Sequence, residues 1–229
     1  MEDLSKLFKD QGLLELALTH RSWLNEHKGK RGSNERLEFL GDAVLEFVVS
    51  RELYKSFPDQ EEGFLTALRA NLVNTNSLAD VARKLSLGSI IFLSRGEEET
   101  GGRDNSSLLA DTVEAIIGAL FIDQGVEKAE EFIYNNLLKD LDERAKMPLK
   151  DSKSLLQEYV QSKSLSTPRY KVVEQTGPDH DKHFVIEVIV GEKTWGRGEG
   201  KSKAQAEQEA AKSALAVVQY PDKENNKHD

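Results

Sequence analysis

The chain of 229 residues contains no cysteine. Disulfides and thiolate metal sites are therefore excluded, and any metal must be held by oxygen or imidazole ligands, which favours hard cations. No apolar run approaches the roughly 20 residues of a membrane span, and no N-terminal stretch has the form of a secretory signal. These absences predict a soluble, cytoplasmic protein with no membrane contact.

Basic residues are also fewer than acidic residues. The chain has 31 Lys and Arg against 40 Asp and Glu, a net charge of −9, whereas a nucleic-acid-binding protein normally carries a basic footprint. The average conceals a division, because residues 1–149 carry all of the −9, while residues 152–219 hold ten basic against nine acidic residues. Two regions of different electrostatic character share the chain.

The first region has apolar residues at helical spacing and almost no alternation typical of strands. The pattern predicts an all-helical domain over residues 1–143, with helices at about 3–9, 12–18, 34–56, 61–74, 76–85, 107–124 and 127–142. Periodicity is then lost around Pro148, so residues 144–151 are predicted to be a linker.

The second region, residues 152–220, changes its periodicity. A helix is predicted at 154–162, strands at 170–175, 184–190 and 194–200, and an Ala-rich helix at 202–218. This α-β-β-β-α order in about 70 residues resembles the layout of a double-stranded-RNA-binding domain. Residues 221–229 have nothing apolar to bury and are predicted to be a disordered tail.

Two helices whose residues are otherwise mostly apolar, and which are therefore expected to be buried, also contain acidic residues. Glu35, Glu38 and Asp42 are spaced i, i+3 and i+7 on one helix, and Asp111 and Glu114 are spaced i, i+3 on another. A single acid of this kind could lie on a solvated face or pair with an arginine.

Candidate arginine partners are Arg36, Arg69 and Arg103, but they are few for the whole set, and the flanking faces are apolar. Facing carboxylates repel each other and raise their pKa values unless a divalent cation neutralises them. Ligands that are all oxygen indicate Mg²⁺ or Mn²⁺.

Three blocks carry a resemblance to a known family. Residues 34–42, Asn-Glu-Arg-Leu-Glu-Phe-Leu-Gly-Asp, match the ribonuclease III signature, and residues 17–22 and 109–115 resemble its other two blocks in the right order. The resemblance implies a magnesium-dependent endonuclease that cuts double-stranded RNA, leaves 5′-phosphate and 3′-hydroxyl ends with short 3′ overhangs, and processes rRNA and mRNA precursors. Manganese would be able to replace magnesium, and no other small-molecule cofactor is expected.

The resemblance also assigns roles to the acids. It implies a metal site made of Glu38, Asp42, Asp111 and Glu114, with Asp42 and Glu114 as the catalytic residues. His20 is interpreted as structural rather than as a general base.

Family members act as homodimers, which the resemblance implies for this chain. Phe39 would then insert into a pocket of the partner, while Glu35 and Glu62 line the cleft. The residues alone favour a different interpretation of Phe39, as an ordinary core side chain.

RNA-binding candidates come from the second region. Gln157 and Gln161 are spaced i, i+4, which suits contact with 2′-hydroxyls. His180 lies in the loop between the first two predicted strands. Lys201 and Lys203 lie at the start of the last predicted helix, where they could contact phosphates.

The last helix departs from the family pattern in having Ala204 and Glu207 where basic residues are usual, and Glu207 is predicted to pair with Lys203. Two other functions stay open: a catalytically silent RNA-binding protein that keeps the helical domain for dimerisation, and an adaptor with a structural cation site.

Overall fold

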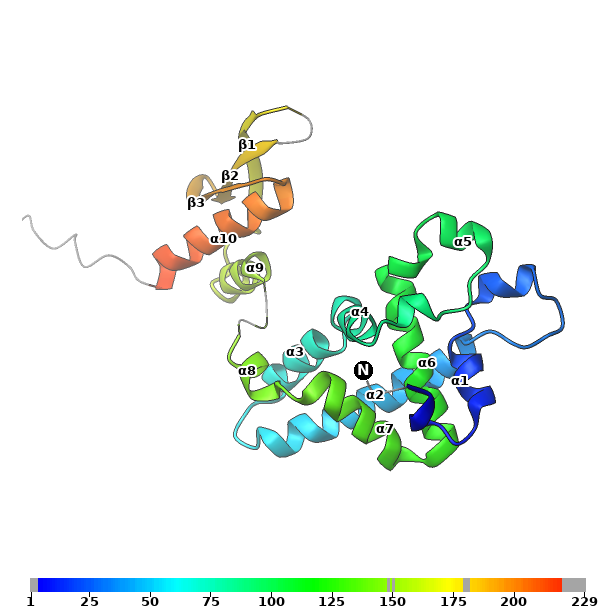
Figure 1. Ribbon diagram of the computed structural model, residues 1–229. Helices are drawn as coiled ribbons and strands as arrows, with labels where there is room; N and C mark the ends of the chain where they lie inside the picture. Colours follow the sequence, from blue (N-terminus) through cyan, green and yellow to red (C-terminus); the bar gives the residue numbers. More distant parts are fainter. Residues whose placement is uncertain (1–3, 148, 150, 179–181, 220–229) are drawn as a thin grey trace, which may run out of the picture. The chain divides into compact units, whose positions relative to one another are not determined.

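The computed structural model describes residues 4–147, 149, 151–178 and 182–219. The chain divides into two compact units, residues 1–149 and 150–229 (Figure 1). Among the described residues, no helix has the length and apolar character needed to span a membrane.

The first unit is helical throughout, as predicted. Its elements are η1 (Leu4–Leu7), α1 (Gln11–Ala17), η2 (Arg21–Asn25), α2 (Glu35–Ser56), α3 (Glu62–Leu72), α4 (Thr75–Lys84), η3 (Leu87–Ser89), α5 (Arg95–Glu99), η4 (Gly102–Asp104), α6 (Ser106–Gln124), α7 (Val126–Ile133), the π-helical turn η5 (Tyr134–Leu138) and α8 (Leu141–Ala145). The predictions missed η2, η3, α5 and η4, which are too short to show a periodic pattern.

Two long helices, α2 and α6, form the centre of this unit. Helix α6 contacts α1, α2, α4 and α7, and eleven of its nineteen residues are buried, so it has almost no solvated face. Its N-terminus is capped by Asn105, whose Oδ1 accepts hydrogen bonds from the backbone N–H groups of Ser107 and Leu108. The acids on α6 therefore lie in a rigid, densely packed helix.

The end of the first unit differs from the prediction in two ways. The helix expected at 127–142 is divided into α7, the π-helical turn and α8, and the wider turn brings both Leu137 and Leu138 into the core. Helix α8 extends two residues into the predicted linker, because Arg144 and Ala145 both belong to it. The Arg144 guanidinium donates a hydrogen bond to the backbone oxygen of Asn71 at 2.9 Å and holds α8 on the helical unit.

The second unit has the predicted α-β-β-β-α order: α9 (Ser152–Ser162), β1 (Arg169–Thr176), β2 (His183–Val190), β3 (Lys193–Gly200) and α10 (Lys203–Gln219). The strands form an antiparallel sheet in the order β1-β2-β3 (Figure 1). Leu156 and Val160 of α9 share one core with Phe184, Ile186 and Val188 of β2 and with alanines of α10. Both helices therefore cover the same face of the sheet. The predicted tail, 221–229, lies outside the described residues.

Candidate metal centre and RNA-binding surface

The start of α2 is held by a buried asparagine. Asn34 is the residue before the helix, yet its side chain does not cap it. Its Nδ2 donates to the backbone oxygen of Ala17 at 3.2 Å, and its backbone N–H donates to the oxygen of Thr19 at 2.8 Å. Asn34 therefore joins two of the three sequence blocks, a role that could not be predicted from the sequence because it needs contacts distant along the chain.

Three acids from the two central helices converge. Glu38 of α2 and Asp111 and Glu114 of α6 each offer one carboxylate oxygen, and these oxygens all lie within 4.8 Å of one another. The three side chains are partly buried. Asp42 is exposed one turn further along α2 and is not a member of this group, although its charge acts on two of them.

The electrostatics of the group favour protonation in the absence of a cation. Burial, reinforced by repulsion from Asp42, Asp111 and Glu38, raises the pKa of Glu114 to about 8. Burial also raises the pKa of Glu38, with added repulsion from Asp111, Glu35 and Asp42. The pKa of Asp111 is raised by burial as well, although nearby His20 opposes the shift. A positive charge placed among these groups would offset both the cost of burying charged carboxylates and their mutual repulsion.

Among the described residues, no arginine forms an ion pair with Glu38, Asp111 or Glu114, although Arg21, which pairs with Glu35, partly opposes the raised pKa of Glu38. Arg69 Nε pairs with Glu46 at 2.9 Å, and Arg103 Nε pairs with Glu98 at 2.7 Å. Arg36 is exposed and forms no ion pair with another described residue. The arginine-paired interpretation is therefore wrong for Glu38, Asp111 and Glu114, and these three acids have the donor chemistry and spacing that suit a hard divalent cation.

A groove of about 610 Å³ opens beside Asp111. Its polar lining includes His20, Arg21, Asn25 and Ser107. His20 Nδ1 lies 2.8 Å from Ser22 Oγ and accepts a hydrogen bond from the Ser22 backbone, and burial lowers the pKa of His20. These contacts agree with a structural role for the imidazole, which lies close enough to Asp111 to affect its pKa.

Phe39 is not a core residue. It is 81% exposed, so the core interpretation drawn from the residues alone was wrong. Phe47 (56% exposed) and Tyr54 (75% exposed) lie on the same side of α2 by helical spacing. The three side chains form an exposed apolar stripe, and Glu35 and Asp42 lie between this stripe and Glu38 around the helix.

The two acids predicted to line the cleft are both exposed. Glu35 accepts a hydrogen bond from Ser33 Oγ at 2.7 Å and lies 3.7 Å from Arg21 Nη1. Glu62 begins α3 and accepts a hydrogen bond from Thr66 Oγ1 at 2.8 Å. No contact between described residues joins Glu62 to the acidic cluster.

The predicted RNA-binding side chains are exposed where the structure describes them. Gln157 and Gln161 lie on the open side of α9, away from buried Leu156 and Val160. Lys201 and Lys203 flank the start of α10 and form no ion pair with described residues. His180 lies outside the described residues.

Glu207 does not pair with Lys203, so this prediction was wrong. Its carboxylate lies 2.6 Å from the ammonium of Lys153, at the start of α9, and that ammonium is 4.8 Å from the centre of the Tyr170 ring. Lys203 instead lies 5.9 Å from the ring centre of Phe184. Glu207 therefore joins α10 to α9, a partnership that helical spacing could not reveal because Lys153 is 54 residues away.

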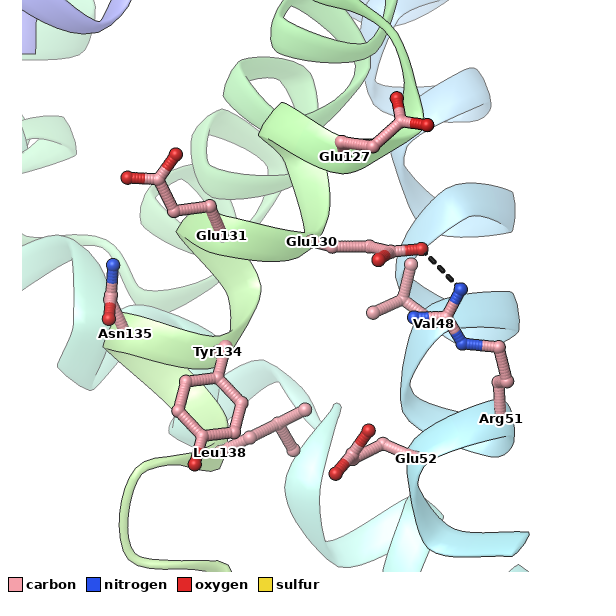
Figure 2. A pocket seen from close by; sticks show the side chains of 9 residues that line it. All are labelled: Val48, Arg51, Glu52, Glu127, Glu130, Glu131, Tyr134, Asn135 and Leu138. Atoms are coloured by element: carbon pink, nitrogen blue, oxygen red, sulfur yellow. Dashed lines mark ion pairs between the residues drawn. The ribbon is translucent and has the colours of Figure 1, made fainter. Parts of the chain in front are cut away.

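A second acidic pocket lies elsewhere on the helical unit. It has a volume of about 330 Å³ and is lined by α2, α7 and the π-helical turn (Figure 2). Glu130 pairs there with Arg51, while Glu52, Glu127 and Glu131 also line the pocket. None of its lining residues is a predicted site residue.

Together, the fold and the site define a class of protein: a helical unit with an acidic site suited to a cation, followed by a unit of the double-stranded-RNA-binding type. Comparison with protein families agrees for both units. A model described as ribonuclease-III-like matches residues 10–141, and the double-stranded RNA binding motif matches residues 152–218.

Curated relatives extend the match over nearly the whole chain. A ribonuclease 3 of Borreliella burgdorferi is 44% identical over 222 residues, which cover 96% of this chain and 90% of the relative. A ribonuclease 3 of Caldanaerobacter subterraneus subsp. tengcongensis is 48% identical over 212 residues, 92% of this chain and 93% of the relative. The chain belongs to the ribonuclease III family.

Solved structures support the helical unit separately. The nuclease domain of ribonuclease III from Campylobacter jejuni is 43% identical, with a TM-score of 0.55 over 61% of this chain and 97% of that chain. The chain is thus an endoribonuclease of this family, with a nuclease domain followed by a domain for double-stranded RNA. This finding excludes the two non-enzymatic alternatives.

Proposed function

We propose that the chain is a magnesium-dependent endonuclease that hydrolyses double-stranded RNA as a homodimer. The convergence of Glu38, Asp111 and Glu114, with no arginine paired to them among the described residues, is the observation that carries the metal assignment. Mn²⁺ would be able to replace Mg²⁺, since both accept oxygen ligands.

The proposed mechanism follows from the positions of the acids. Glu38, Asp111 and Glu114 would hold the cation, and Asp42 is proposed to complete this site from its exposed position one turn after Glu38. When bound, such an ion lowers the pKa of a water molecule and stabilises the leaving oxygen of a phosphodiester. Asp42 and Glu114 are the proposed catalytic residues.

The groove beside Asp111 is proposed to receive the strand that is cut. Arg21 contributes a positively charged guanidinium group, and Asn25 and Ser107 contribute neutral hydrogen-bond donors. The groove can therefore accept a phosphate group next to an acidic centre. Attack of water on phosphorus, with the bond to the 3′ oxygen breaking and that oxygen taking up a proton, would leave 5′-phosphate and 3′-hydroxyl ends. The proposed cellular role is rRNA and mRNA precursor processing in the cytoplasm, which rests on the family alone.

Incubation of long duplex RNA with the full chain, with and without Mg²⁺, tests the proposal. We expect cleavage only with Mg²⁺, and end-group analysis should find 5′-phosphates and short 3′ overhangs. Ca²⁺ should permit binding with little turnover, because it is larger and more flexibly coordinated. Cleavage in the presence of a chelator, or ends with 3′-phosphate, would refute the mechanism.

The homodimer proposal rests on the exposed stripe of Phe39, Phe47 and Tyr54. A second copy covering it would come to lie beside Glu35 and Asp42, and the related nuclease domain from Campylobacter jejuni has a structurally flexible region involved in dimer formation. Two sites would then cut one strand each.

Phe39→Glu should weaken dimerisation at least about 10-fold by burying a charge, as measured by analytical ultracentrifugation. Exposed Ile122 of α6, changed to Glu, is the control; equal dimerisation of wild type and Phe39→Glu would refute the interface.

A further inference from the structure

The two helices that carry the acids touch through their backbones at two glycines. A Cβ atom built on Gly41 of α2 would lie 1.8 Å from the backbone oxygen of Glu114. A Cβ atom built on Gly118 of α6 would lie 2.2 Å from the backbone oxygen of Leu37 and 3.0 Å from the backbone nitrogen of Gly41. Neither contact can be relieved by turning a side chain, because the atoms encountered belong to the backbone.

These contacts lie at or next to the acids along the chain. Gly41 meets the carbonyl of Glu114, and Gly118 meets the carbonyl of Leu37, the residue before Glu38. Glu38 is the one member of the group on α2, while Asp111 and Glu114 lie on α6. The separation between Glu38 and the other two acids is therefore set by how closely the two helices approach at this crossing.

We propose that Gly118 is a positioning residue for the metal, acting through the crossing rather than touching the ion. Any side chain there would force α2 and α6 apart by about 1 Å before ordinary van der Waals contact is restored. Mg²⁺ requires oxygen ligands at about 2.0–2.1 Å in near-ideal octahedral geometry, whereas Ca²⁺ accepts about 2.3–2.6 Å and flexible geometry. A wider crossing would therefore reduce Mg²⁺ binding more than Ca²⁺ binding. This inference rests on the proposed metal site.

Gly88 provides a matched control. A Cβ atom there would lie 2.2 Å from the backbone oxygen of Arg103, the same distance as at Gly118, but the contact joins η3 to η4 and involves none of the acids. Gly88→Ala and Gly118→Ala should therefore both lower the melting temperature of the full chain. Loss of stability alone would affect metal binding in both variants.

The experiment is a calorimetric titration of the full-length wild type and both variants with Mg²⁺ and with Ca²⁺, without RNA. We expect Gly118→Ala to weaken Mg²⁺ binding by about 10–100-fold, the range typical of groups that orient metal ligands, and Ca²⁺ binding by less. Gly88→Ala should bind both ions as the wild type does. Equal Mg²⁺ affinity of Gly118→Ala and wild type, or equal losses in both variants, would overturn the inference. A wild type that binds no Mg²⁺ would instead overturn the metal assignment.

A measurement on the wild type covers the case in which Gly118→Ala does not fold. If a wider crossing weakens Mg²⁺ binding, then Mg²⁺ must stabilise the closed crossing by the same free energy, because coupling is reciprocal. Mg²⁺ should therefore slow amide hydrogen exchange in peptides that cover residues 37–41 and 114–118. Peptides that cover residues 87–89 should change little. Unchanged exchange at the crossing under saturating Mg²⁺ would refute the coupling.

Discussion

The two units of the chain differ in how they present functional groups. In the nuclease unit, Glu38, Asp111 and Glu114 are partly buried between packed helices, and burial raises their pKa values. In the RNA-binding unit, the candidate residues that the structure describes are all exposed: Gln157, Gln161, Lys201 and Lys203. The acidic site needs geometry from two helices, whereas the RNA surface needs charge and shape on one side of a small domain. A single change should therefore have large, localised effects in the first unit and small, graded effects in the second.

The largest expected effect separates cleavage from binding. Glu114→Gln should reduce cleavage of duplex RNA on the order of 10³-fold, equivalent to about 4 kcal/mol of activation free energy. Duplex affinity should change little, because the second unit, which matches the double-stranded RNA binding motif, is expected to supply much of the binding. Single-turnover cleavage and filter binding on the same preparation would measure both quantities. Glu127→Gln, the same chemical change at an exposed position on α7, should cleave normally. Retained cleavage by Glu114→Gln would contradict the metal assignment.

The second effect concerns stability without metal. Glu114 has a pKa of about 8 in the folded chain against an ordinary value of 4.5. Between these values the folded state holds a proton that the unfolded state has lost, so stability should fall as pH rises from about 4.5 to 8. Full burial would make this shift worth about 5 kcal/mol, but Glu114 is only partly buried, so solvent screening lowers the expected loss to on the order of 3 kcal/mol. Above pH 8 this group contributes no further change.

Melting temperatures in a chelator at pH 5, 6.5 and 8 would test this pH dependence. Glu114→Gln should show a shallower decline than wild type, because the amide does not titrate, and Glu127→Gln should keep the full decline. Mg²⁺ should restore stability most strongly at the highest of these pH values. Parallel declines in the wild type and Glu114→Gln would show that Glu114 is not the group responsible.

The third effect is on the stability of the RNA-binding unit. Glu207→Gln leaves the ammonium of Lys153 without its carboxylate partner, and both side chains are partly buried, with 37% of Lys153 and 26% of Glu207 exposed. We expect a loss of about 1–2 kcal/mol after allowance for solvent screening. Hydrogen exchange in β3 and α10 of the full chain would measure it. Glu209→Gln breaks a more exposed pair, 3.9 Å from Lys212, and should lose less than about 0.5 kcal/mol. Equal effects of the two changes would contradict the structural role of Glu207.

The smallest effect concerns affinity for RNA. Ala204 is exposed beside Lys203 at the start of α10, and Ala204→Lys should add about one phosphate contact, which tightens binding and steepens its salt dependence by about one unit. Cleavage positions should not move, because phosphate contacts carry no sequence information. Dissociation constants over a salt series would decide the matter. Ser213→Lys, further along α10, is the control; equal slopes for Ala204→Lys and wild type would place the start of α10 away from RNA.

Much of the fold could be predicted because its signals are local. The 3.6-residue period located α2 and α6 to within a residue or two, and alternation in β2 located the sheet. The spacing of Glu38, Asp111 and Glu114 on two buried helices also indicated a shared acidic site. The predictions failed where the deciding partner is distant in sequence, as for Glu207, which pairs with Lys153 rather than with Lys203.

The sequence by itself determined the helical and α-β-β-β-α units, the acids and their cation chemistry. These features depend on hydrophobic periodicity, charge and residue type, which can be identified from residues close together in the chain. The tertiary structure decided three things. It placed Phe39 on the surface rather than in the core, gave Asn34 its role in joining two blocks, and brought Gly41 and Gly118 into backbone contact. Each depends on which elements pack together, and the free energy of packing comes from contacts between residues far apart in the chain.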